Sequence, residues 1–346
     1  MSELTTHERP GVYSSYTASS VVDSKAGAKT VAVVAAQGSG ENGKVYDFTR
    51  FEQAAEAFGA ADRLTQLVRL LFLNGAGAVV ALPVAGEEGY QAGFDAVAQR
   101  EDVSIVVCDS TNLTIQQALW ESVKAASAAR RERIAVVCAP AEETVSQLVT
   151  RAQALNEARV VLVAPGEAEG GAATVAAAVA GAIAGERDPA VPLGGAELKG
   201  IGGLTGRYND SEIDLLVRGG VTPLESVAGT VSVVRGVTTQ TKRGSNPDAT
   251  WRELTTILIV DDVIPSIRNS LRAKFPRAKN TAQSRGAIRS QVILELENKM
   301  AREIITGYEN VTVAPKEDNP TVCLVDFSFT VAHGLNQIWL TAHITV

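Results

Sequence analysis

The chain has 346 residues, of which 45% are hydrophobic and 21% charged, and its formal net charge is −7. This is the composition of an ordinary globular protein and excludes an intrinsically disordered one. The negative charge disfavours non-specific binding to nucleic acid or anionic lipid, and aromatic residues, at 5%, are too scarce for a base-stacking surface. No signal peptide is recognisable, and no apolar run approaches the roughly 20 residues that a membrane span needs.

Residues 1–29 are polar and rich in Ser and Thr, with Pro10 and Gly11 followed by Val12 and Tyr13. Pro10 fixes its own φ and disfavours helical geometry at the residue before it. We therefore expect an extended N-terminal arm that has little core of its own.

Residues 30–187 alternate short apolar runs with helical patterns. Runs that are apolar throughout are typical of parallel strands covered by helices on both faces. The expected strands are Thr30–Ala36, Ala78–Pro83, Val103–Cys108, Ile134–Cys138 and Val160–Ala164. The expected helices are Phe51–Asn74, Tyr90–Gln99, Thr114–Arg130, Glu142–Leu155 and Gly170–Ile183. This order predicts an α/β domain with a mainly parallel sheet flanked by helices.

Residues 188–333 no longer alternate short apolar runs with helical patterns, and they predict a C-terminal α+β domain. A short helix is expected at Ser211–Val217 and a strand at Thr230–Val237. Two long helices follow, Trp251–Lys274, where Pro265 would break or kink the helix, and Ser284–Thr306.

The end of the chain has the clearest strand pattern, which predicts a terminal antiparallel β segment. Within Thr321–His333, alternate residues are apolar: Cys323, Val325, Phe327, Phe329 and Val331. Residues 334–346 predict a C-terminal arm strand whose apolar face holds Ile338, Leu340, Ala342, Ile344 and Val346. An apolar edge strand at a terminus favours pairing with another chain.

A glycine-rich segment, Gly38–Gly43, matches the G-x-G-x-x-G pattern of dinucleotide-binding loops and follows an expected strand. In such loops the third glycine opens a helix whose N-terminus faces the pyrophosphate. Here Gly43 leads into Lys44–Phe48, which has no helical pattern, so a flexible turn is favoured. A nucleotide- or cofactor-binding α/β enzyme that uses this loop stays open as an alternative.

Other catalytic chemistry is not indicated, and we predict no catalytic, cofactor-binding or metal site. His7, His333 and His343 are scattered, which argues against a metal cluster or a Ser–His–acid arrangement. Asp261 and Asp262 are adjacent and so point apart, as expected of a structural or interface feature.

Asp109 ends an expected parallel strand, where doubly wound enzymes place catalytic groups, but a helix cap is favoured. Cys108, Cys138 and Cys323 lie in apolar runs, where buried reduced thiols are expected.

The segment from Arg235 to Arg289 is markedly basic in an acidic protein. Such a run is typical of a solvated face, but it also suits an acidic surface on a partner or on the next copy.

Taken in chain order, short motifs at both ends and between them resemble the tail sheath proteins of contractile phage tails and phage-tail-like bacteriocins. The resemblance covers nearly the whole chain, and its specificity lies in the order and spacing of the motifs. The motifs are Pro10–Tyr13, Gly38–Gly43, Phe48–Phe51, Phe58-Gly59, Phe72–Gly77, Val234–Thr239, Trp251–Leu254, Asp261–Val263 and the closing β segment.

The resemblance implies a structural subunit, not an enzyme, that polymerises into stacked, usually hexameric rings around an inner tail tube and contracts. Partners would be further copies, the inner tube protein, and baseplate and tail-end proteins, with no cofactor, nucleic acid or direct membrane insertion. Assembly in the bacterial cytoplasm and incorporation into a phage tail or tail-like particle would follow. Pro10–Tyr13 and the C-terminal strand would be arms that pair with neighbours, and Arg268, Arg272 and Lys274 would contact the tube. A non-contractile structural adaptor of similar fold stays open.

Overall fold

The computed structural model describes residues 29–36, 39–168 and 171–344. Its strands are β1 (Thr30–Ala35), β2 (Tyr46–Phe48), β3 (Ala78–Pro83), β4 (Val103–Cys108), β5 (Ile134–Cys138), β6 (Val160–Ala164), β7 (Glu167–Ala168), β8 (Gly171–Ala172), β9 (Val221–Val227), β10 (Thr230–Val233), β11 (Lys242–Arg243), β12 (Asn246–Pro247), β13 (Ile305–Lys316) and β14 (Asn319–Val331). Its helices are α1 (Phe51–Phe58), α2 (Arg63–Asn74), the 3-10 turn η1 (Glu87–Gly89), α3 (Tyr90–Ala98), α4 (Leu113–Ala128), α5 (Val145–Leu155), α6 (Thr174–Gly185), α7 (Asp210–Arg218), α8 (Leu254–Lys274) and α9 (Ala282–Ala301).

The largest sheet in the described part of the chain has eight strands in the order β10-β9-β6-β5-β4-β1-β3-β2. The strands from β9 to β3 pair in parallel, and the two edge strands, β10 and β2, are antiparallel to their neighbours. This confirms the expected fold class, because every apolar run predicted as a parallel strand lies in the middle of the sheet.

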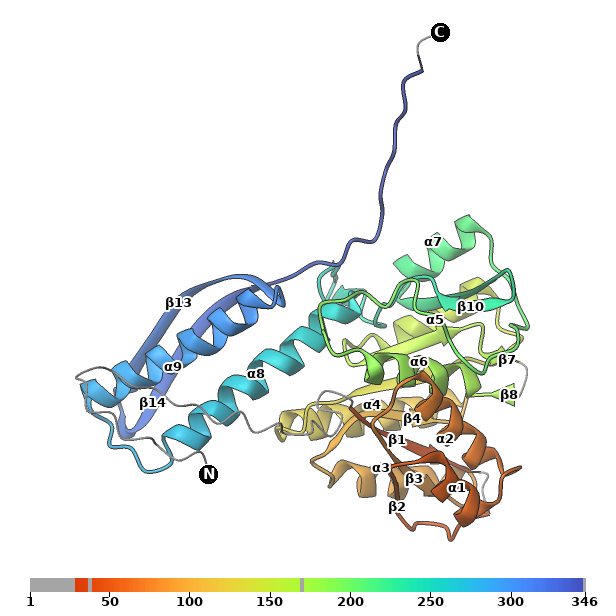
Figure 1. The fold of residues 1–346 in the computed structure, drawn as a ribbon, viewed down its shortest axis with the longest axis horizontal. Coiled ribbons are helices and arrows are strands. Elements are labelled where there is room, and N and C mark those ends of the chain that lie inside the picture. Colours follow the sequence, from red (N-terminus) through yellow and green to blue (C-terminus); the bar gives the residue numbers. More distant parts are fainter. Residues whose placement is uncertain (1–28, 37–38, 169–170, 345–346) are drawn as a thin grey trace, which may run out of the picture.

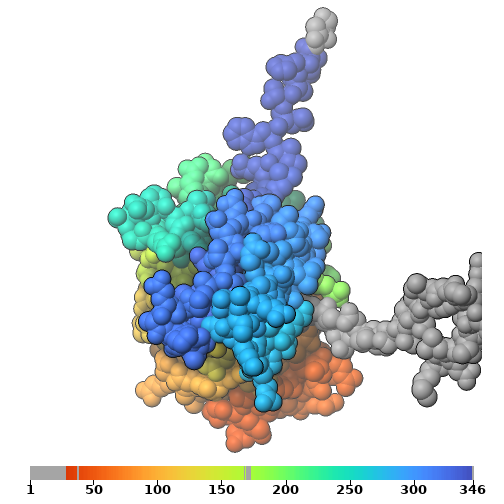
Figure 2. Space-filling model, turned by 90° about the vertical axis from the view of Figure 1, so that its left-hand side faces the viewer, coloured from red at the N-terminus to blue at the C-terminus, as the bar shows by residue number. Residues whose placement is uncertain are grey.

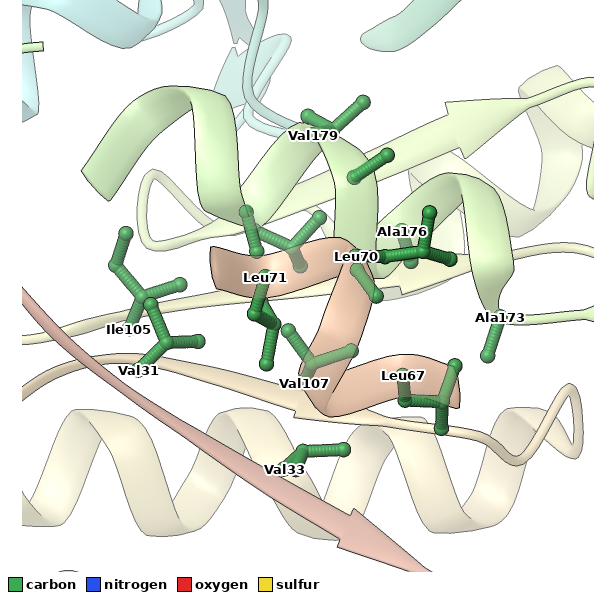
Figure 3. Close-up of a cluster of buried hydrophobic side chains, with 14 of the residues drawn as sticks. Val31, Val33, Leu67, Leu70, Leu71, Ile105, Val107, Ala173, Ala176 and Val179 are labelled. Carbon is green, nitrogen blue, oxygen red and sulfur yellow. The ribbon is translucent and has the colours of Figure 1, made fainter. Parts of the chain in front are cut away.

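Each face of this sheet is covered by its own helices (Figure 1). In β1, Val31 and Val33 belong to a cluster that includes α2 and α6, whereas Ala32 and Val34 belong to one on the opposite face that includes α3, α4, α5 and α7. The helix α6 is Ala-rich and buried along nearly its whole length, so it packs closely against both α2 and the sheet (Figure 3).

The C-terminal part is a second layer with its own core. The long helix α8 runs beside α9, and the antiparallel pair β13–β14 packs against α9 (Figure 1). Ile259, Val263 and Ile267 of α8 share this core with Val292 and Leu296 of α9. The helix α8 continues through Pro265 without a break.

Several expected boundaries were wrong for identifiable reasons. The helix expected at Phe51–Asn74 is two helices, because the side chain of Asp62 accepts from the Leu64 backbone and caps a new one, α2. The helix expected to reach Thr306 ends at Ala301, where Glu303 adopts a left-handed φ of 58° and the strand β13 begins two residues later.

The division expected after residue 187 does not coincide with the edge of the large sheet. The sheet takes β9 and β10 from beyond that point, with Val221 pairing with Leu162. The strand β9 was not recognised, because Pro223 and Glu225 interrupt its apolar run.

Candidate assembly surfaces

The two-stranded sheet β13–β14 has two open backbone edges within the described chain. The strands pair antiparallel with each other, as in Val313 with Val325 and Tyr308 with Phe329. No other described strand joins this sheet. Each strand therefore directs one row of backbone N–H and C=O groups away from its partner, which is a template for a further strand.

The alternation expected for β14 is confirmed, and it determines which face of the two-stranded sheet packs against the core. Val325, Phe327, Phe329 and Val331 pack against the core of the C-terminal part, and the rings of Phe327 and Phe329 stack with centroids 6.3 Å apart. Cys323 lies only half-buried near the other end. Because one face is held by α8 and α9, the edges stay in place while the opposite face meets solvent.

After β14 the chain becomes a tail that projects away from the rest of the described residues (Figures 1 and 2). The backbone N–H of Ala332 donates to the carbonyl of Ile304 at 3.2 Å, and no strand is present from there to residue 344. Large apolar side chains of the tail are exposed: Ile338 by 80%, Leu340 by 91% and Ile344 by 87%. Contiguous apolar side chains in solvent are typical of interaction sites in other proteins.

The predicted arm residues fall in different parts of this picture. Ile338, Leu340, Ala342 and Ile344 lie in the exposed tail. Pro10, Gly11, Val12, Tyr13 and Val346 lie outside the described residues.

The candidate tube-contacting residues lie on the second half of α8 but do not act alike. Arg268 turns toward the part of the chain that is built on the large sheet. Its Nη2 lies 2.5 Å from Oε1 of Glu132. The hydrogen bond to Glu132 raises the pKa of Arg268. Lys274 Nζ donates to Gln291 Oε1 at 2.5 Å on α9, and Arg272 is exposed. Of these three residues, Arg272 and Lys274 are exposed, near the C-terminal end of α8.

The adjacent carboxylates Asp261 and Asp262 point to different neighbours, as expected. Asp261 forms a bidentate pair with Arg159 at 2.7 and 2.8 Å, and both side chains are 15% exposed. Asp262 accepts from Lys299 of α9 at 2.5 Å. Burial raises the pKa of Asp261, although the hydrogen bond from Arg159 opposes it. These pairs tie α8 to the large sheet on one side and to α9 on the other.

The geometry of the glycine-rich loop does not favour dinucleotide binding. Gly38 lies outside the described residues, and Gly43 leads into the strand β2, so no helix N-terminus follows the loop. A Cβ on Gly40 would lie 2.6 Å from the ring of Phe58, so this glycine is explained by packing. The loop is held by Asp62, whose Oδ2 accepts from the Ser39 backbone at 2.8 Å.

Asp109 is not a helix cap, contrary to the sequence-based expectation. Asn112 caps α4 by accepting from the Thr114 backbone at 2.9 Å. The Asp109 carboxylate accepts instead from the Tyr90 hydroxyl and from the Ala36 backbone N–H, the latter at 3.2 Å. Burial and the neighbouring carboxylate raise the pKa of Tyr90. Asp109 thus joins the ends of β1 and β4, where doubly wound folds bind ligands.

Among residues 29–36, 39–168 and 171–344, no group of three or more His, Cys, Asp or Glu side chains could hold a metal ion. None of the helices in the same ranges is long and apolar enough to cross a membrane.

Two family models match the chain, and together they cover more than half of it. The phage tail sheath protein central domain matches residues 84–239, and the phage tail sheath C-terminal domain matches residues 246–345. This chain belongs to the phage tail sheath family.

This chain is also similar to a curated relative in sequence and to solved structures in fold. A tail sheath protein of Bacillus phage SP01 is 31% identical over 135 residues, which are 39% of this chain and 23% of that protein. The match thus spans less than a quarter of the relative's length. A chain in the cryo-EM structure of the anti-feeding prophage baseplate has a TM-score of 0.75 at 17% identity, covering 99% of this chain and 100% of its own. A chain of the contracted helical sheath of the same particle has a TM-score of 0.71 at 15% identity, covering 98% and 99%.

The Arg159–Asp261 pair should contribute strongly to the attachment of α8. Replacing Asp261 with Leu should lower the free energy of unfolding by about 3–5 kcal/mol, because Arg159 would stay buried without its counter-charge. The matched control is Asp214→Leu, which breaks the exposed pair of Asp214 with Arg218 and should cost less than about 1 kcal/mol. Urea unfolding measures both. Equal small losses would contradict the structural role of the buried pair.

Proposed function

We propose that this sheath-family chain is the structural subunit of a contractile sheath, and that its exposed tail adds a strand to the β13–β14 sheet of a neighbouring copy. The observation that carries the proposal is a tail with alternating apolar residues next to a sheet with two open edges. Sheath membership and the likeness of fold to a chain of a contracted helical sheath support it.

The tail and the sheet edge are chemically complementary. Strand addition satisfies backbone groups on both sides, and each hydrogen bond contributes about 0.5–1.5 kcal/mol net. Ile338, Leu340 and Ile344 would lose solvent exposure together because they lie on one face of an extended strand. Burying each of these side chains contributes about 1.5–3 kcal/mol. The tail leads away from its own sheet, which favours pairing with a neighbour (Figure 1).

Strand exchange also suits a tube that changes shape. Backbone bonding along a whole strand holds two subunits together while the globular surfaces shift between two packings as rigid bodies. A gap of a few kcal/mol per subunit between these packings adds up along a tube and drives contraction without a nucleotide. A non-contractile adaptor would assemble through the same arms but would keep one tube diameter.

The partners proposed from family membership are further copies in stacked, usually hexameric rings, an inner tube, and baseplate and tail-end proteins. Assembly would take place in the bacterial cytoplasm before incorporation into a phage tail or tail-like particle. The N-terminal residues Pro10–Tyr13 would form the second arm. A structural role of this kind requires no catalytic site.

The tail's apolar face should be necessary for polymerisation but not for folding. Changing Leu340 to Asp should abolish tubes while the melting temperature stays that of the unaltered chain, because Leu340 is 91% exposed in the single chain. Thr341→Asp is the matched control, since Thr341 lies on the opposite face of an extended strand. Negative-stain microscopy of both variants decides the matter, and normal tubes from Leu340→Asp would refute the proposed role of the tail.

The basic tip of α8 is proposed to contact the inner tube. Seven basic and no acidic residues lie between Arg268 and Arg289, and the exposed surface of this stretch suits an acidic partner.

Arg272→Glu combined with Lys274→Glu should reduce copurification with the tube protein, because both changes reverse surface charge at the proposed contact. Arg218→Glu, an exposed charge on α7, is the control and should leave copurification unchanged. Copurification that is unaffected by the double change would count against this surface.

A further inference from the structure

The root of the tail, residues 332–336, crosses from the C-terminal part to the connection between α6 and α7. It lies between two hollows. One is lined by residues such as Met300, Glu303 and Val191, and the other by Arg235, Glu253 and Thr255. The root begins at Ala332, whose backbone N–H donates to the carbonyl of Ile304. This hydrogen bond fixes the first residue of the root to the residue that precedes β13.

Two residues later, Gly334 lies against the ring of Pro192. A Cβ built on Gly334 would lie 2.8 Å from Pro192 Cβ, 2.8 Å from Cγ and 3.1 Å from Cδ. Carbon atoms prefer separations of about 3.5–4.0 Å, so no side chain fits between this backbone and the ring. The close approach of the backbone to the Pro192 ring explains why residue 334 is a glycine.

The ring of Pro192 is not free to move aside. On one side the Val191 N–H donates to the Asp188 carbonyl at 3.2 Å, and on the other the Gly195 N–H donates to the Val233 carbonyl at 2.7 Å. The next residue, Leu193, packs against the core beneath the large sheet. Any side chain at position 334 would therefore displace the tail and leave the proline in place.

We propose that the contact between Gly334 and Pro192 is the positioning element that sets the direction in which the C-terminal arm leaves the subunit, and thereby which neighbour it reaches. The root is fixed to the C-terminal part at Ala332 and seated on the large sheet's layer at Gly334, so the direction is defined by both parts together. Beyond Gly334 the tail is exposed, and a small rotation at its root moves the far end by a long distance. This inference rests on the proposed strand exchange and adds how the arm is aimed.

The test uses the full chain with spin labels at Thr341→Cys in the tail and Ser211→Cys on α7, in a Cys323→Ser background. Gly334→Ala should shift or broaden the label-to-label distance distribution of the monomer while leaving its melting temperature unchanged. The double variant Gly334→Ala with Pro192→Gly removes all three close carbon atoms and should restore the original distribution. Gly206→Ala is the matched control, because a Cβ there would lie 3.7 Å from Pro165 Cβ, which is an ordinary van der Waals separation.

The same variants, without labels, are then assembled. Gly334→Ala should lose pelletable tubes or give tubes with altered helical twist, and the control should assemble as the unaltered chain does. An unchanged distance distribution in Gly334→Ala would overturn the positioning role. A changed distribution with normal tubes of normal twist would overturn the claim that the direction selects the neighbour. Absence of tubes from the unaltered chain would count against the proposed function, while the distance measurement would still decide the positioning role.

Discussion

The unpaired backbone of the β13–β14 sheet is the constraint on which the functional architecture depends. A two-stranded sheet leaves a row of donors and acceptors on each outer edge, and such edges invite pairing with another chain. The tail has a matching apolar alternation but projects away from the rest of the described residues (Figure 2). In the proposed strand exchange, a single copy would carry both halves of an interaction that a second copy completes.

The rest of the fold holds these two halves at fixed positions. The parallel sheet provides a rigid layer, and α8 is attached to it by Arg159 with Asp261 and by Glu132 with Arg268. Lys299 with Asp262 ties α9 to the same helix. Because one face of this sheet packs against α9 and the core that α9 shares with α8, the direction of the sheet follows the attachment of α8. The close contact between Gly334 and Pro192 then fixes the start of the tail relative to the same sheet and helices.

The parts of this arrangement that depend on local patterns could be predicted from the sequence. The buried parallel strands are uninterrupted apolar runs, and the alternation from Val325 to Val331 defines one face of β14. The parts that depend on long-range pairing could not. The strand β13 follows a helix with little punctuation, and β9 contains Pro223, yet both are strands because a partner edge is available.

The interaction partners of individual side chains could likewise not be predicted from the sequence. Arg268 belongs to a basic run that suggested a free surface, whereas its guanidinium pairs with Glu132, which lies 136 positions away in the chain. Asp109 was expected to cap a helix, whereas it accepts from Tyr90 and Ala36. In both cases the choice between a local and a distant partner is made by tertiary packing. The closeness of Gly334 to Pro192 also has no local signature.

Helical cryo-EM reconstruction of tubes assembled from the full chain tests the central claim most directly. The account predicts that residues 337–344 of one subunit form a strand hydrogen-bonded to an open edge of β13 or β14 in a neighbour. A tube in which the β13–β14 sheet stays two-stranded, with the tail lying elsewhere, would contradict it.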